Sequence, residues 1–510
     1  MHRISRATLL ALSCLLLASL VVTQGPASAV ASSLTPQNRM LGWRGDKVTG
    51  SVRDPSSCGF ENQSVGESKC TSYYFSVNIP GDYWSAQRGS LGIKIRWIDR
   101  DDDFDLYIYR ADRLIKSSRQ RRSTSESVSF KNPKPGTYRA VVVPFRVTDS
   151  GYGGFARLRV APPPPETRYY AVPTSIHSDC SRDVTPALLR WIGRVPNNAT
   201  LSFSRGGCYR IDKRLSIVDR WGLTFQGNGA TFKAVTEGRS TRAHFFFLGG
   251  GNLAIRNLTV IGANPNAGLD LDAFRKSLQW QHAFSLNGVQ GAVLDNVRAS
   301  DVFGDFVFIG EDTRNVRIWS KDVTVQNSTF ERNGRQGIVV FGGEDVTIRW
   351  NWLGEVRMTT FDLEPAAHLG ARNVVITNNV TGRGLQPWFV SSGDGFNVSN
   401  VHVVGNIMIF DSGIPLVAVE TPEGGWRGPF YIADNDLIVR ESPKGAFEFT
   451  RADNVTIANN TATFLLRNRM TAVLLQESRG VRVTGNHFYG AARIVKADPD
   501  SEYSESENET

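Results

Sequence analysis

A chain of 510 residues is too long for a single ordinary core, so its length excludes a minimal one-domain fold and predicts two domains. The formal net charge of +9 favours a polyanionic partner, but the scattered lysines and arginines argue against a nucleic-acid-binding protein. Beyond the first 29 residues there is no apolar run of about 18 residues, so we expect no membrane span.

The first 29 residues have the pattern of a signal peptide. Arg3 and Arg6 precede the apolar run LLALSCLLLASLVV, and Ala27-Ser28-Ala29 forms a small-residue cleavage site. We therefore expect a secreted, extracellular protein whose mature chain starts near residue 30.

Four cysteines lie beyond that segment and fall as two local pairs. An oxidising compartment favours disulfides, so we expect the bonds Cys58–Cys70 and Cys180–Cys208. A zinc site is less favoured, because neither a CxxC spacing nor a histidine pair accompanies these cysteines.

Residues 30–160 show the alternation of a β-rich domain. The stretch KIRWIDRDDDFDLYIYRAD alternates around an acidic turn, and KPGTYRAVVVPF is a turn followed by a strand. The segments DFDLYIY (103–109) and PGTYRAVV (135–142) resemble the bacterial pre-peptidase C-terminal domain. That resemblance implies a small β-sandwich with an accessory role beside a secreted enzyme. The aspartates of the turn at 99–105 are either Ca²⁺ ligands or a solvated turn.

The proline-rich stretch APPPPETR marks a boundary, and we place a linker at residues 161–172. The second domain spans 173–495. It begins with TPALLRWIGRV (185–195), whose apolar residues recur at helical spacing and predict an amphipathic helix. The remaining segment, 496–510, is rich in acids and is expected to be a disordered tail.

A recurring phrase of alternating apolar and polar residues ending in asparagine runs through the second domain, for example VTVQNSTF and VRVTGNHF. A period of this size is typical of a solenoid. Three short strands per repeat predict an all-β fold, a right-handed parallel β-helix, with the helix capping its open end. The asparagines would stack as an amide ladder; they are Asn327, Asn351, Asn378, Asn406, Asn435, Asn459 and Asn486.

The segments ALLRWIGRVPNNATLSFSRGGCYRI and LTFQGNGATF resemble the opening coils of the pectate-lyase superfamily. That resemblance covers the second domain and implies a carbohydrate-active protein, because the superfamily includes polygalacturonases, polysaccharide lyases and uronate epimerases. The adjacent aspartate pair and Gly-His-Gly of polygalacturonases are absent, as is a clear pectate-lyase calcium motif. The resemblance therefore implies the fold rather than the reaction.

A second strand follows each asparagine phrase, in residues 304–310, 335–341 and 359–365. Alternation assigns their faces. The residues expected to point inward are Phe306, Phe308, Ile338, Val340, Phe361 and Leu363. Asp305, Asp362 and Glu364 would then project from one outer wall, with Gly337 leaving space beside them.

The expected functional residues gather around that wall. The predicted catalytic residues are Asp362, Glu364, Asp305, Arg335 and His368. The predicted substrate-binding residues are Trp388, as an aromatic platform for a sugar ring, with Gln336, Asp301, His282 and Arg357.

Two reaction classes suit these residues. Asp362 and Glu364 are about 6.7 Å apart as residues i and i+2 of a strand, a separation that suits the acid and base of a glycoside hydrolase. Alternatively, Asp362, Glu364 and Asp305 bind Ca²⁺ in a uronate lyase or epimerase. Either enzyme would degrade or modify a linear, anionic polysaccharide as a monomer, with no other cofactor. The remaining alternative is a non-catalytic glycan-binding or cell-surface β-helix.

Overall fold

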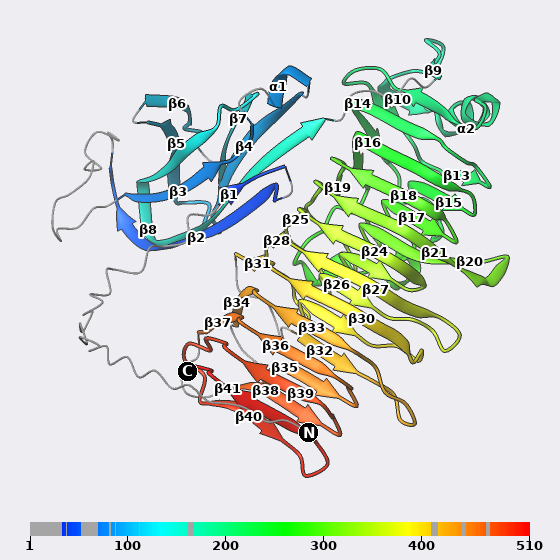
Figure 1. Cartoon of the computed structure of the whole chain (residues 1–510). Coiled ribbons are helices and arrows are strands. Elements are labelled where there is room, and N and C mark those ends of the chain that lie inside the picture. Colours follow the sequence, from blue (N-terminus) through cyan, green and yellow to red (C-terminus); the bar gives the residue numbers. More distant parts are fainter. Residues whose placement is uncertain are drawn as a thin grey trace, which may run out of the picture.

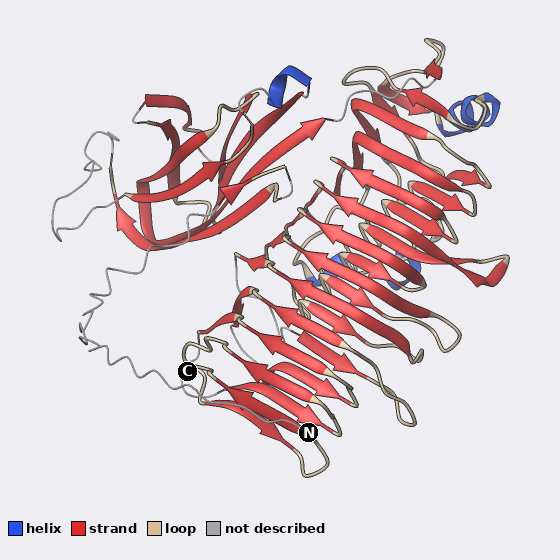
Figure 2. Ribbon diagram, in the orientation of Figure 1, coloured by secondary structure: helices blue, strands red, loops and turns tan. Residues whose placement is uncertain are grey.

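The computed structural model describes most of both domains; the ranges are 33–36, 38–52, 70–80, 83–86, 88–111, 113–121, 123–161, 168–409, 417–439, 445–465 and 470–510. The expected signal peptide and Cys58 lie outside these residues. Figure 2 shows strand in nearly every ordered element, with helix limited to short segments. Among the described residues, no helix has both the length and the apolarity needed to cross a bilayer.

The first domain is a β-sandwich, as predicted (Figure 1). Its longest strand, β8, joins the two sheets: residues 136–146 pair with β3 and β5, and residues 147–161 pair with β2 and β4. The resemblance to the pre-peptidase C-terminal domain stays a prediction. The strands are β1 (Ser33–Leu34), β2 (Met40–Gly50), β3 (Thr71–Val77), β4 (Arg88–Arg96), β5 (Asp103–Arg110), β6 (Arg113–Ser118), β7 (Ser125–Lys131) and β8 (Gly136–Ala161).

The second domain is a right-handed parallel β-helix, which confirms the predicted fold class. Each coil contributes one strand to each of three faces, and every strand pairs in parallel with its equivalent one coil later (Figure 1). The site face comprises β13 (Leu215–Val218), β15 (Phe245–Leu248), β17 (Phe284–Asn287), β20 (Val307–Asp312), β23 (Ile338–Val340), β26 (Phe361–Leu363), β29 (Phe389–Ser391), β32 (Val417–Glu420), β35 (Gly445–Thr450), β38 (Thr471–Gln476) and β40 (Arg493–Ala497).

The two other faces meet at the asparagine turn. Around the middle of the solenoid the long face comprises β18 (Gln290–Asp295), β21 (Asn315–Gln326), β24 (Gly343–Arg349), β27 (Gly370–Thr377), β30 (Asn397–Val404), β33 (Phe430–Ala433), β36 (Val455–Ala458), β39 (Val481–Thr484) and β41 (Tyr503–Ser506). The short face comprises β19 (Arg298–Ser300), β22 (Thr329–Phe330), β25 (Trp352–Leu353), β28 (Val380–Thr381), β31 (Ile407–Met408), β34 (Asp436–Val439) and β37 (Thr461–Phe464).

The amide ladder is present, but three of the seven predicted asparagines are not among its rungs. Asn379 and Asn460 form rungs in place of Asn378 and Asn459, which precede them with a left-handed φ of 53°. Two residues therefore share each turn: a left-handed residue, then a buried asparagine whose Nδ2 donates to the next Oδ1. The rungs are Asn351, Asn379, Asn406, Asn435, Asn460, Asn486 and Asn508. Asn327 is outside this ladder; it has a left-handed φ and donates to Asp295.

Both ends of the solenoid are defined by its pairing. The expected helix is α2, Thr185–Arg194, which buries Leu188, Trp191 and Ile192 over the first coils. The disulfide Cys180–Cys208 is confirmed beside it. The expected linker ends earlier than predicted, because β9 (Arg168–Ala171) already pairs with β11 (Ala199–Ser202).

The acidic segment 496–510 is not a disordered tail. Strand β41 pairs in register with β39, and Asn508 supplies the last rung of the ladder. The prediction was wrong because Asn508, in coil register, makes part-buried hydrogen bonds with Asn486 and Val483, which composition alone does not show.

The sandwich packs against the short face of the solenoid. Met40 and Phe155 join Trp352 and Ile409 in one apolar cluster, and the Phe155 and Trp352 rings stack 5.1 Å apart. A side chain at Gly153 would collide with Ile409, so only glycine allows this approach. Ion pairs flank the apolar contact, with Arg44 2.5 Å from Asp436 and Arg96 2.6 Å from Glu331.

Candidate functional site

The register of three site-face strands places Asp362 on the outer wall. Phe308, Val339 and Asp362 are partners in β20, β23 and β26, and the residues on either side of Asp362, Phe361 and Leu363, belong to the core. The predicted orientation of Asp362 is therefore correct. The predicted faces of β20 were wrong by one residue: Val307 and Ile309 point into the core, and Phe308 faces outward.

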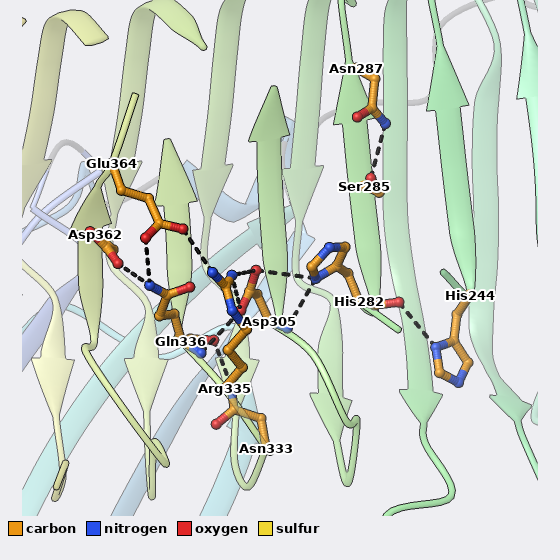
Figure 3. A network of polar contacts seen from close by, with 10 residues as sticks. All are labelled: His244, His282, Ser285, Asn287, Asp305, Asn333, Arg335, Gln336, Asp362 and Glu364. Carbon is orange, nitrogen blue, oxygen red and sulfur yellow. Dashed lines mark hydrogen bonds and ion pairs between the residues drawn. The ribbon is translucent and has the colours of Figure 1, made fainter. Parts of the chain in front are cut away.

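The turn before each site-face strand supplies the other polar groups. Asp305 precedes β20, and Arg335 and Gln336 precede β23, so the turns of adjacent coils bring them together (Figure 3). The peptide N–H of Gln336 donates to Asp305 at 3.0 Å. A side chain at Gly304 would meet His282 and the backbone of Gln279, so glycine there lets the turn before β20 approach the segment before β17.

Arg335 links the two ends of the cluster. Its Nη1 donates to both Asp305 oxygens at 3.1 and 2.9 Å, and its Nη2 donates to Glu364 at 2.8 Å. Asp305 is completely buried. Burial works against ionisation of Asp305, but Arg335 and then His282 outweigh it and hold the pKa of this carboxyl below its ordinary value.

Asp362 has the opposite electrostatic character. It is 2% exposed, and its Oδ1 has no hydrogen-bond partner. Burial, followed by the charge of Glu364, raises the pKa of Asp362 well above its ordinary value, although Arg335 opposes the shift. Gln336 covers this carboxyl, donating from Nε2 to Asp362 and, at 3.2 Å, to Glu364. The site thus places a carboxyl with a raised pKa two residues from a carboxylate that is paired with arginine.

His282 completes the cluster, although the sequence marked it only as a substrate-binding candidate. Its Nδ1 lies 3.0 Å from the peptide nitrogen of Asp305 and 3.1 Å from Oδ2 of the same residue. Its ring stacks on Phe308 at 5.0 Å, and its carbonyl lies 3.1 Å from Nδ1 of the buried His244. Burial, followed by the charge of Arg242, lowers the pKa of His244 to about 3, so this second histidine is neutral.

Other predicted site residues lie outside the network. Trp388 is not a sugar platform: it is 1% exposed, packs edge-on against Phe361 and donates to Thr381. His368 pairs with Glu311 at 3.0 Å. The remaining two have other partners as well: Asp301 pairs with Arg332, and Arg357 donates to the carbonyl of Leu271.

The sequence reading missed an aromatic pocket beside the cluster. A cavity of about 320 Å³ on the same face is lined by Phe246, Trp280, Phe308 and Phe341. The run Phe306–Ile309 at the start of β20 is wholly apolar, so alternation could not show that Phe308 faces outward. Only the pairing of coils reveals which aromatic residues share the wall.

The predicted Ca²⁺ site does not fit these residues. Both oxygens of Asp305 accept from Arg335, and Glu364 accepts from Arg335 and Gln336. The raised pKa of Asp362 favours a protonated carboxyl, which is a poor ligand for a hard cation. The guanidinium therefore stands where a cation bridging the three carboxylates would bind.

No protein-family model matches the chain, and no curated protein matches it. Solved structures with a similar arrangement include the catalytic unit of an α-1,3-glucanase from Streptomyces thermodiastaticus. That match has 12% identity, a TM-score of 0.47 and coverage of 92% of this chain and 96% of that one.

Two further matches cover the larger part of this chain. An endo-xylogalacturonan hydrolase from Aspergillus tubingensis has 15% identity, a TM-score of 0.47 and coverage of 67% and 96% of the two chains. The A-module of the mannuronan C-5 epimerase AlgE6 from Azotobacter vinelandii has 15% identity, a TM-score of 0.46 and coverage of 65% and 96%. What this chain does therefore has to be argued from its own side chains.

Proposed function

We propose that the protein is a glycoside hydrolase that degrades a polysaccharide bound along the site face. Asp362 is the general acid and Glu364 is the base that activates water. This proposal rests on the difference between two carboxyl groups at the end of β26. Burial raises the pKa of Asp362, whereas Glu364, two residues later, is paired with Arg335.

The two carboxyl groups are close neighbours in the unliganded site, because Nε2 of Gln336 donates to an oxygen of Asp362 and to an oxygen of Glu364. A glycoside hydrolase uses such a pair of carboxyl groups, one of them as the acid and the other as base or nucleophile. Arg335 and Gln336 hold Glu364 in place, while Asp305, which is fully buried, is a positioning residue for Arg335.

Gln336 has a gating role in this proposal. Its amide covers the Asp362 carboxyl, and its own Oε1 is buried without a hydrogen-bond partner. Hydrogen bonds at unliganded catalytic sites often rearrange when substrate binds. Displacement of this amide by a sugar hydroxyl would expose the acid to the glycosidic oxygen.

Lyase and epimerase chemistry are less well supported. Both reactions need a positive group that neutralises the uronate carboxylate before the C5 proton is removed. Arg335 is already shared between two carboxylates and is not free for that task. A non-catalytic glycan-binding or cell-surface protein is the remaining alternative, and it predicts binding without product.

Export also belongs to this proposal. The Cys180–Cys208 disulfide fits an oxidising compartment, and the first 29 residues fit a signal peptide. An enzyme that cleaves polymers benefits from release outside the cell.

The test is a screen of purified protein against neutral and acidic polysaccharides. A hydrolase yields new reducing ends without an unsaturated uronide, and its activity survives EDTA. Ultraviolet absorbance from an unsaturated product, or binding with no product from any polymer, would overturn the proposal.

A further inference from the structure

The aromatic pocket beside the acid cluster has the size and lining of a sugar-binding site. Its volume is about 320 Å³, and its lining includes the rings of Phe246, Trp280, Phe308 and Phe341. Trp280 is 43% exposed, so its indole is available to a ligand. Ser285 and Asn287 lie among these rings and place a hydroxyl and an amide at the pocket wall.

The pocket adjoins the proposed catalytic pair. Val340 and Leu363 are register partners, so Phe341 and Glu364, the next residue of each chain segment, lie one coil apart. Neighbouring strands are about 4.8 Å apart. Phe308 shares a column with Asp362 two coils away. A sugar ring bound in the pocket would therefore lie within one sugar unit of Asp362 and Glu364.

Charge around the site does not favour an anionic ligand. In the acid cluster two carboxylates, Asp305 and Glu364, face the single guanidinium of Arg335. On the pocket rim, Arg214 stacks on Phe246 at 4.2 Å while Glu311 supplies the opposite charge. The +9 charge of the whole chain is spread over distances at which salt screens it, since the Debye length is about 8 Å at physiological ionic strength.

We propose that this pocket is a subsite for an uncharged pyranose, and that the substrate is a neutral polysaccharide. This inference rests on the proposed function for the position of the cut, and it replaces the expectation of an anionic polymer. The apolar face of the ring packs on Trp280 and Phe341, and its hydroxyls reach Ser285 and Asn287.

Calorimetric titration of the full chain tests the subsite separately from catalysis. The Asp362→Asn variant is titrated with hexasaccharides of glucose, xylose and mannose, and with hexagalacturonate. Trp280→Ala and Phe341→Ala are added singly to that background. Trp426→Ala is the matched control, because Trp426 is similarly exposed (38%) and also contacts an arginine, Arg479.

At least one neutral hexasaccharide should bind, and each pocket variant should weaken its affinity roughly tenfold or more, while the Trp426 variant is unchanged. Tighter binding of hexagalacturonate, unaltered affinity in both pocket variants, or no binding of any neutral hexasaccharide would overturn the inference. Pocket-dependent binding by a protein that never cleaves a polymer would uphold the subsite and overturn only the hydrolase.

Discussion

The asparagine ladder lies on the same coils as the cluster of Asp305, Arg335, Gln336, Asp362 and Glu364, which we call the acid wall. The two differ in how fully their buried polar groups are hydrogen-bonded. In the ladder each rung repeats its neighbour: Asn406 donates to the carbonyl of Ile376 at 2.9 Å and to Asn435 at 3.0 Å. Buried amides satisfied in this way stabilise the stack.

The wall has no such repetition. Asp362 occupies a column whose partners in the adjacent coils are Val339 and Val390. Its Oδ1 and the Oε1 of Gln336 are buried without partners, and its pKa is strongly raised. The asparagines that recur from coil to coil stabilise the solenoid, whereas the buried carboxyl that interrupts an apolar column is the group to which the proposed function assigns the role of general acid.

Replacing Asp362 by Asn should have the largest effect on activity. Asparagine matches the shape of the neutral carboxyl but cannot donate its proton to the leaving group. Because general acid catalysis contributes roughly 10²–10⁴-fold, we expect kcat to fall about 10³-fold on the polymer identified by the screen. Unfolding in denaturant should show no loss of stability.

Wild-type activity in Asp362→Asn would remove Asp362 from the mechanism. Glu331→Gln serves as the control, since this glutamate lies on the same turn as Arg335 but contacts Arg96 of the sandwich. It should retain most of its activity.

Replacing Asn406 by Ala should show the reverse pattern. The substitution leaves the carbonyl of Ile376 and the amides of the two neighbouring rungs short of partners. Each buried unsatisfied group costs about 1–3 kcal/mol, so the free energy of unfolding should fall by roughly 3 kcal/mol. Folded Asn406→Ala should cleave substrate at the wild-type rate. A lower kcat at a temperature where the variant is fully folded would contradict the separation of roles.

The ladder and the wall were predictable to different extents. The asparagine period identified the fold, and alternation about Phe361 and Leu363 placed Asp362 outward, because a single polar residue between two core residues leaves no choice of phase. The apolar run Phe306–Ile309 offered no such signal, so Phe308 was assigned to the wrong side.

The remaining errors have separate causes. Trp388 precedes its strand and turns into the core against Phe361, which depends on the conformation of the turn rather than on residue type. Asn508 lies 22 residues after Asn486, so the period did extend into the acidic segment, but composition outweighed it in the prediction. His282 joined Asp305 through a contact between coils that no local pattern contains.

The stability of the protein should fall as pH rises toward the pKa of Asp362. The folded state keeps a proton on this carboxyl that the unfolded chain has lost above about pH 4. Between those two pKa values the folded protein binds more protons, so the free energy of unfolding drops by up to about 1.4 kcal/mol per pH unit. Asp362→Asn should lack this decline when both proteins are unfolded by denaturant between pH 4 and 8. Parallel profiles would show that Asp362 is ionised in the folded state.

The smallest effect is expected where the sandwich meets the turn that carries the wall. Arg96 pairs with Glu331 at 2.6 Å and lies over the Trp352 ring at 5.0 Å, with about a fifth of each charged side chain exposed. Partly exposed ion pairs and cation–π contacts each contribute about 0.5–1 kcal/mol, so Arg96→Ala should lower the free energy of unfolding by about 1 kcal/mol.

The control for Arg96→Ala is Lys47→Ala, which breaks the exposed pair with Asp149 and should change stability by less than about 0.5 kcal/mol. Glu331 lies four residues before Arg335, so the kcat of Arg96→Ala shows whether the sandwich helps to position the catalytic turn. An unchanged kcat would mean that the ladder and the coil register are sufficient to position Arg335. A lower kcat with unchanged KM would mean that the sandwich domain also positions it.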